Sequence, residues 1–340
     1  MTIIERMAPP DFSSQSYWQD RFTATQTPFE WLLPLDDTTR IVAKLISDHS
    51  TNRAGVSDPP PHGPYILHIG CGTSELSLCL RDWVCCPSHV HNVDYSEEAV
   101  KFGRRREEAL FASRDADQRR MRWSTADLLS LPGVHSLTGE DGTLFDFILD
   151  KSTSDAIACG DNIAVLSTWA GGGDDGPSSV SLPPVEVLAL HLAAITAVGG
   201  RWIAISYSGD RFGFLERITH AEIETARNND ISTAADSQPV DGQVVKPATF
   251  WRLEKKEQLA IPESEVSTGR NKSTHTVHRP TIGHWLYVLT RTKASLETDM
   301  SPSTSEFILA SIQDIQDPAL SEYHSRSAGD KNSHRTIWTL

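Results

Sequence analysis

The stretch YILHIGCGTSE, residues 65–75, determines the fold class, because an apolar run passes directly into a glycine loop. Residues 65–69 predict a short buried strand, and the apolar positions within 74–83 predict the helix that follows. A strand, a tight glycine loop and a helix in this order are typical of a cofactor site in an α/β fold.

Further strands and helices alternate downstream of this unit. The apolar runs and turn residues predict strands at 90–93, 121–125, 144–149 and 201–207, helices at 96–106 and 184–196, and a turn at Gly199-Gly200. This alternation predicts a doubly wound parallel sheet whose ligands lie beyond the carboxyl ends of the strands. Two later apolar runs, 250–253 and 284–289, predict a terminal antiparallel pair.

Charge and composition limit the partners. The 340 residues carry a formal net charge of -14, so the chain offers no broad basic surface for a phosphate backbone, and we expect no nucleic-acid partner. Arg104 to Arg106 are followed at once by Glu107 and Glu108, which indicates a solvated helix face.

Neither a signal peptide nor a run of about 20 apolar residues is evident, so we expect a cytoplasmic protein, cytosolic or nuclear, that does not span a membrane. In such a reducing compartment the five cysteines stay thiols. A cluster of Cys79, Cys85, Cys86, His89 and His91 has poor spacing for tetrahedral ligation, and we expect no metal.

The glycine loop carries information about the cofactor. Gly70 and Gly72 supply two glycines of a dinucleotide fingerprint, but Glu75 stands at the third position, where it would repel a pyrophosphate. A nicotinamide cofactor is therefore disfavoured. S-adenosylmethionine has no phosphate and carries a positive charge, which fits the loop better.

Carboxylates follow the next two predicted strands. Asp94 is placed to accept hydrogen bonds from both ribose hydroxyls, and Asp127 to accept one from the adenine amino group. Each of them alone is equally compatible with a helix cap. Their occurrence at successive strand ends beside the glycine loop favours the cofactor interpretation.

Several segments resemble the methyltransferase-like family that contains the elongation factor 1-alpha lysine methyltransferases. They are residues 66–74, 92–96 and 145–156, the opening segments 17–22 and 29–31, residues 199–203 and Arg211-Phe212. The resemblance covers about 14–217 and resumes at 250–291. The string Asp150-Lys151-x-Thr153-x-Asp155-Ala156 is its narrowest part.

The resemblance implies a seven-stranded Rossmann-like methyltransferase sheet, mostly parallel with a terminal antiparallel hairpin. It also implies S-adenosyl-L-methionine as the cofactor, contacted by Trp18, Phe22, Trp31, Gly70, Cys71, Gly72, Asp94, Tyr95, Asp127, Leu128 and Lys151. The aromatic residues suit an N-terminal lid over the cofactor, with ordinary core packing as the alternative.

The same reasoning divides the chain into three parts. Residues 1–63 form the predicted cofactor lid and linker, 64–293 the class I methyltransferase domain, and 294–340 a peripheral tail. We expect loops at 49–63 and 168–184, a polar insertion at about 222–249, and a second polar stretch at 263–279.

A protein lysine is the expected acceptor, in a partner protein such as a translation factor. The alternatives are a small-molecule O- or N-methyltransferase and a cofactor-binding scaffold without catalysis. A lysine must lose its proton before attack, and Asp150 or Asp155 is the predicted catalytic residue. Asp155 has the alternative role of a helix cap, and Lys151 that of an ion-pair partner. Ser152 departs from the family, which usually has glycine there.

Overall fold

A seven-stranded sheet forms the centre of the computed structural model, which describes residues 10–53, 63–111, 120–167, 178–216, 246–259 and 283–294. Its strands are β1 (Ile66–Ile69), β2 (Val90–Asp94), β3 (Arg122–Thr125), β4 (Phe145–Lys151), β7 (Thr196–Ser206), β8 (Trp251–Leu259) and β9 (His284–Arg291). They are ordered β3-β2-β1-β4-β7-β9-β8. The first five are parallel, and β9 pairs antiparallel with β7 and β8. The predicted mostly parallel Rossmann-like sheet with a terminal antiparallel hairpin is confirmed.

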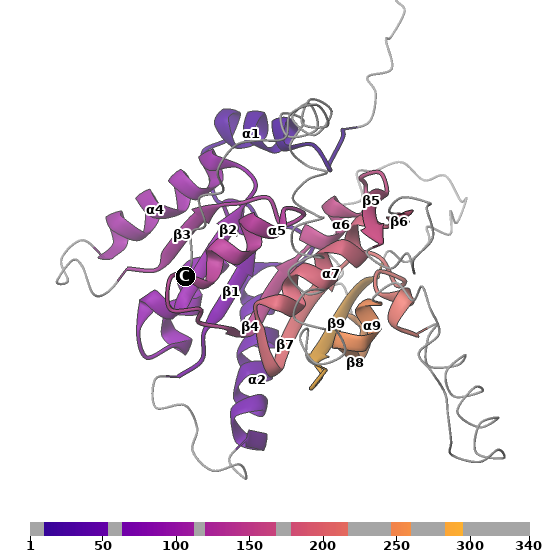
Figure 1. Cartoon of the computed structure of the whole chain (residues 1–340). Coiled ribbons are helices and arrows are strands. Elements are labelled where there is room, and N and C mark those ends of the chain that lie inside the picture. Colours follow the sequence, from indigo (N-terminus) through magenta and orange to yellow (C-terminus); the bar gives the residue numbers. More distant parts are fainter. Residues whose placement is uncertain are drawn as a thin grey trace, which may run out of the picture.

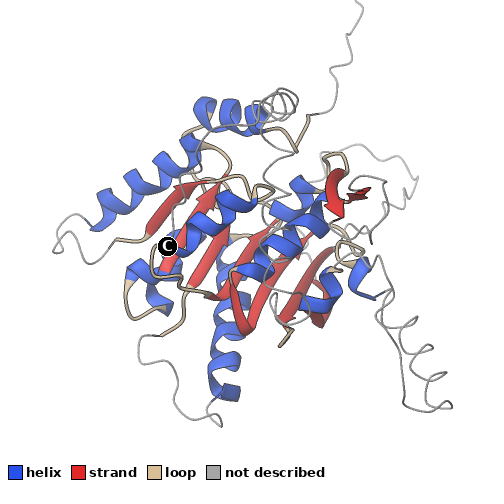
Figure 2. Cartoon of the chain, viewed as in Figure 1, coloured by secondary structure: helices blue, strands red, loops and turns tan. Residues whose placement is uncertain are grey.

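Helices cover both faces of the sheet (Figures 1 and 2). They are α1 (Gln15–Ala24), α2 (Leu35–Arg53), α3 (Leu76–Cys79), α4 (Glu97–Phe111), α5 (Leu131–His135), α6 (Thr153–Ile157), α7 (Pro184–Ala194) and α9 (Pro247–Phe250). Figure 1 shows α5 and α7 in front of the sheet and α1 above its upper edge. Short 3-10 turns follow at Leu80–Trp83, Pro87–His89 and Ser136–Thr138.

Two hydrophobic clusters hold the layers together. The first includes residues of α5, α7 and α9, and the second includes residues of α2, α3 and α4. Trp202 of β7 is fully buried in the first and packs edge-on against Trp251. The Trp251 Nε1–H donates to the carbonyl of Ala189 at 2.7 Å, so its polar atom is satisfied inside the core. Val42 and Ile46 bring α2 into the second cluster.

Some boundaries differ from those predicted. Gly199 and Gly200 lie inside β7 rather than in a turn before it. The strand is irregular at this point, since its register against β4 shifts and Gly199 has a φ of 80°. Part of the expected loop at 168–184 is strand β6 (Ser178–Leu182), paired with β5 (Ile163–Ser167). The helix expected over 74–83 begins at Leu76 and tightens to a 3-10 turn after Cys79. Helix α2 extends into the loop expected at 49–63.

The polar stretches have little described structure. The stretch at 263–279 lies outside the described residues. Of the insertion at 222–249, only residues 246–249 are described, where α9 begins. Of the tail at 294–340, only Ala294 is described. Among the helices that the structure describes, none has the length and apolar character needed to cross a membrane.

Candidate functional site

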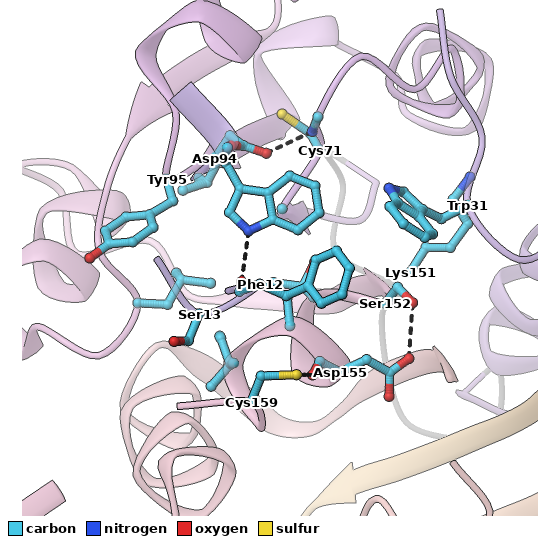
Figure 3. Close-up of a pocket in the computed structure, with 18 of the residues that line it drawn as sticks. Phe12, Ser13, Trp31, Cys71, Asp94, Tyr95, Lys151, Ser152, Asp155 and Cys159 are labelled. Atoms are coloured by element: carbon cyan, nitrogen blue, oxygen red, sulfur yellow. Dashed lines mark hydrogen bonds between the residues drawn. The ribbon is translucent and has the colours of Figure 1, made fainter. Parts of the chain in front are cut away.

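A cavity of about 640 Å³ lies at the carboxyl ends of the parallel strands, within the size range of small-molecule sites (Figure 3). Figure 3 shows Asp94 and Tyr95 on one side of it, Trp31 and Lys151 on the other, and Asp155 and Cys159 below. The structure brings together every residue predicted to contact the cofactor. These lining residues are Trp18, Phe22, Trp31, Gly70, Cys71, Gly72, Asp94, Tyr95, Asp127, Leu128 and Lys151.

The glycine loop forms one wall of the cavity. Gly70 and Gly72 have φ values of 55° and 50°, in the left-handed region that favours glycine. A Cβ on Gly70 would overlap the side chain of Thr153, and one on Gly72 would lie 3.3 Å from the Phe22 ring. Between them, burial raises the pKa of the Cys71 thiol, so this residue is a neutral wall group. The two glycines therefore let the loop pass close to Thr153 and Phe22 while it borders the cavity.

Asp94 ends β2 and stands beside this loop. Its Oδ2 accepts from the Gly72 N–H at 2.7 Å, and its Oδ1 from the Ser96 N–H at 2.8 Å. Burial raises the pKa of Asp94 to about 6, while these N–H donors act in the opposite direction. The carboxylate is therefore ionised at neutral pH and retains lone pairs for further donors.

Asp127 follows β3 on the same edge of the sheet. Its Oδ1 accepts from the Leu129 N–H at 2.8 Å, and its side chain borders the cavity. The helix-cap alternative is wrong for both strand-end carboxylates: Asp94 accepts from Gly72 and Ser96 ahead of α4, and the N-cap of α5 is Ser130. Both side chains border the cavity.

An N-terminal aromatic segment, residues 12–31, covers the cavity. Trp18 of α1 stacks on Phe22 with ring centroids 5.8 Å apart and meets Trp31 edge-on. The Trp18 Nε1–H donates to the carbonyl of Phe12 at 2.8 Å. Phe22 is also buried, so it serves both in the core and in the cavity wall.

Glu30 belongs to the opening segment 29–31, and no role was predicted for it. Its carboxylate accepts from the Ser74 Oγ at 2.7 Å and the Glu75 N–H at 2.8 Å, and pairs with Lys151. Burial lowers the pKa of Lys151, and the charge of Glu30 opposes that change. The suggested ion-pair role of Lys151 is confirmed. Glu30 therefore joins the aromatic segment to the glycine loop and to β4.

Glu75 itself does not line the cavity. Its side chain pairs with Arg106 of α4, so it compensates a nearby arginine rather than a cationic ligand. Arg104 donates to the carbonyl of Trp123, and Arg105 donates to Gln26 of the aromatic segment. Arg104 and Arg105 are exposed and Arg106 is half-buried, as expected of a largely solvated helix face, and all three also make specific contacts.

The two predicted catalytic carboxylates have different placements. Asp150 is not among the lining residues, and its Oδ1 accepts from the Thr153 and Ser154 N–H groups at the start of α6. Burial raises the pKa of Asp150 to about 6. This placement gives Asp150 a structural use as a cap.

Asp155 borders the cavity but is already surrounded by donors. Its carboxylate accepts from the Ser206 Oγ at 2.5 Å and the Tyr207 N–H at 3.1 Å, and pairs with Arg211 at 2.8 Å. The suggestion that it caps the helix near Ala156 is wrong, because α6 begins at Thr153 and the carboxylate faces β7. Its charge is compensated within the protein.

The departure at Ser152 has a structural explanation. Ser152 has a φ of 69°, which a glycine adopts without strain and a serine does not. Its Oγ donates to Asp155 at 2.9 Å, a bond that glycine lacks.

The cysteines and histidines of the cluster that was not expected to bind a metal make separate contacts. His91 is buried and bonds the Leu137 carbonyl and the Ser124 hydroxyl, whereas Cys85 and His89 form a separate pair. Within the described ranges, no group of three or more potential ligands has a geometry suited to a metal.

Comparison with known proteins gives one informative relative. The chain is 32% identical over 203 residues to Methyltransferase srdJ from Neurospora crassa, covering 60% of this chain and 70% of that protein. No protein-family profile matches the chain.

Solved structures that resemble it include an O-methyltransferase from Bacillus cereus in complex with SAH, at 12% identity and a TM-score of 0.40, covering 84% of this chain and 94% of that one. Another is N-methyltransferase NodS from Bradyrhizobium japonicum, at 12% identity and a TM-score of 0.39, covering 84% and 100%.

Proposed function

Because this chain belongs to the methyltransferase family that includes srdJ, we propose that it transfers a methyl group from S-adenosylmethionine to an acceptor in the cavity. The observation that supports this most is the cavity wall formed by the glycine loop, with the Asp94 carboxylate held beside it by the Gly72 N–H. Asp94 suits ribose hydroxyls, and Asp127 with Leu128 suits adenine. The methionine part is then directed toward Lys151 and Trp31.

The chain's own residues have mainly to bind, orient and dehydrate the reactants. When bound, the cofactor supplies an electrophilic methyl group on a sulfonium. Transfer needs the acceptor, methyl and sulfur in line, and enzymes gain rate largely by fixing such an alignment. Trp18, Phe22 and Trp31 close one side of the cavity with apolar rings, which supports exclusion of water.

A protein lysine is the first candidate acceptor. The resemblance of 145–156 to lysine methyltransferases supports it, and the net charge of -14 favours a basic partner. A translation factor is the partner class that this resemblance suggests.

A small molecule with a hydroxyl or amine is the second candidate, because of one observation. Asp155, a carboxylate that borders the cavity, is compensated by Arg211 and three further donors, so it offers little attraction to an ammonium group. A neutral acceptor needs no such attraction.

Radiolabelled S-adenosylmethionine added with the protein to a whole-cell extract tests both candidates. Label in the protein fraction supports the lysine acceptor, and label confined to small solutes supports the second candidate. Asp94→Ala should transfer no label, while Asp141→Asn, at an exposed carboxylate outside the cavity, should behave like the parent. Parent protein that labels neither fraction would defeat the proposed activity.

A further inference from the structure

The far end of the cavity contains a histidine for which no role has been assigned. His284 begins β9 and lines the cavity together with Tyr207, the residue after β7. Since Ser206 of β7 pairs with Trp285 of β9, Tyr207 and His284 occupy neighbouring positions at the carboxyl edge of the sheet. They lie on the opposite side of β4 from the Asp94 carboxylate.

The strand order identifies this end with the acceptor. The residues suited to adenine and ribose follow β3 and β2, and Lys151 ends β4, so the cofactor runs from β3 toward β4. The cavity continues past it to the ends of β7 and β9. Figure 3 shows Asp155 and Cys159 across the cavity from Asp94 and Cys71.

Two charged groups near this end are already engaged. Asp155 is held by Arg211, and Lys151 is paired with Glu30. His68 lies behind the glycine loop, where its Nδ1 contacts the Ser77 hydroxyl at 3.0 Å. His284 differs from these groups, because among the described residues its Nδ1 is buried with no hydrogen-bond partner.

The surroundings of His284 favour a neutral ring. Burial lowers the pKa of His284 below its usual 6.5, and the charge of Asp155 opposes that change only in part. A neutral imidazole always keeps one nitrogen lone pair, and the His284 ring borders the cavity. The ring is therefore able to accept a proton at neutral pH.

We propose that His284 is the general base that removes the proton of the methyl acceptor, an inference that rests on the proposed methyl transfer. The imidazole takes the proton from the acceptor oxygen or nitrogen, whose lone pair forms the new bond to the methyl carbon. The carbon–sulfur bond breaks with its electron pair going to sulfur, which leaves S-adenosylhomocysteine. The imidazolium then returns its proton to water.

Three variants test this proposal: His284→Gln, His284→Ala and the control His89→Gln. His89 is also half-buried but stacks on Tyr65 outside the cavity. Calorimetry should give all three an affinity for S-adenosylmethionine within about twofold of the parent. At saturating cofactor, His284→Gln should label the extract at least about 100-fold more slowly than the parent, because general-base catalysis usually contributes a factor of this size. Added imidazole should partly restore the labelling rate of His284→Ala. An unchanged rate in His284→Gln would overturn the proposal.

A second measurement does not depend on the acceptor. Nitrogen-15 NMR of the histidine-labelled parent, with the His284 signals identified by their loss in His284→Gln, should show a neutral imidazole at pH 7.5 that shifts on addition of S-adenosylhomocysteine. A charged imidazolium at this pH would reject His284 as the base. If the parent binds cofactor but labels nothing, the proposed function fails, and the NMR result still decides whether His284 can accept a proton.

Discussion

At the scale of the residue, Asp94 and Gly70 have the most specific surroundings among the residues that line the cavity. Asp94 ends a buried strand, so its carboxylate is removed from water, yet backbone N–H groups hold it in place. Gly70 accepts a backbone conformation and a proximity to Thr153 that no other residue tolerates. Both positions were identified from the sequence, because strand ends and glycine loops have strong local patterns.

The pKa of Asp94 predicts that cofactor binding and stability respond to pH in opposite directions. With a folded pKa of about 6 against an ordinary 3.8, ionising Asp94 costs the folded protein free energy, so its contribution to stability rises as pH falls from about 6 toward 3.8. Binding needs the ionised form, so affinity for S-adenosylmethionine should fall about tenfold per pH unit below about 6.

Calorimetric titrations between pH 5 and 8 measure this dependence. Asp94→Asn should bind at least tenfold more weakly at pH 7.5, because charge-assisted hydrogen bonds are lost, and should remove most of the pH dependence. An Asp94→Asn protein that keeps the parental pH profile would show that another group is responsible.

A substitution of Gly70 should be more damaging than the same change at a matched glycine. Gly142 also has a positive φ, 64°, but nothing lies within 4 Å of a Cβ there. Gly142→Ala should cost about 1 to 2 kcal/mol of unfolding free energy from backbone strain alone. Gly70→Ala should cost more and also weaken cofactor binding, as measured by denaturant unfolding and calorimetry. Equal losses in the two variants would contradict the role given to Thr153.

At the scale of the element, the N-terminal aromatic segment is attached to the sheet by a few polar contacts. Glu30 reaches the glycine loop and Lys151, and Gln15 donates to the carbonyl of Tyr95 at 2.9 Å. The Ser96 hydroxyl donates to Gln19 at 2.8 Å. These contacts place three indole and phenyl rings over the cavity, which makes the segment part of the cavity wall.

Removing one partner of the Glu30–Lys151 pair should be worse than removing both. The two side chains are 18% and 5% exposed, and a buried charge left without its partner typically costs about 3 to 5 kcal/mol. Glu30→Gln should therefore lower the unfolding free energy and cofactor affinity, and the double variant Glu30→Gln/Lys151→Met should recover part of the stability. Additive losses in chemical denaturation would argue that the pair is not coupled.

Asp150 accepts hydrogen bonds from the backbone at the start of α6, and this role can be tested by substitution. An asparagine oxygen can accept from Thr153 and Ser154 as the carboxylate does, without the cost of burying a charge. Asp150→Asn should therefore keep cofactor affinity and transfer rate within about threefold of the parent. A loss of rate above 100-fold with affinity intact would restore Asp150 as a catalytic residue.

At the scale of the whole molecule, the pattern of strands and glycines was sufficient to predict the sheet and its cofactor edge. The periodicity of an element is local, and the carboxyl ends of parallel strands must meet at one edge. The β5–β6 hairpin was missed because its second strand is rich in serine and resembles a loop. Contacts such as Glu30 with Lys151, 121 residues apart, or Asp155 with Arg211, arise only from packing and have no sequence pattern.

A calorimetric titration of the whole chain with S-adenosylmethionine tests whether the cavity holds this cofactor. We expect saturable binding of one cofactor per chain at pH 7.5, abolished or weakened at least tenfold in Asp94→Ala and unchanged in Asp141→Asn. No heat of binding in the parent, or an Asp94→Ala titration identical to the parent's, would contradict it.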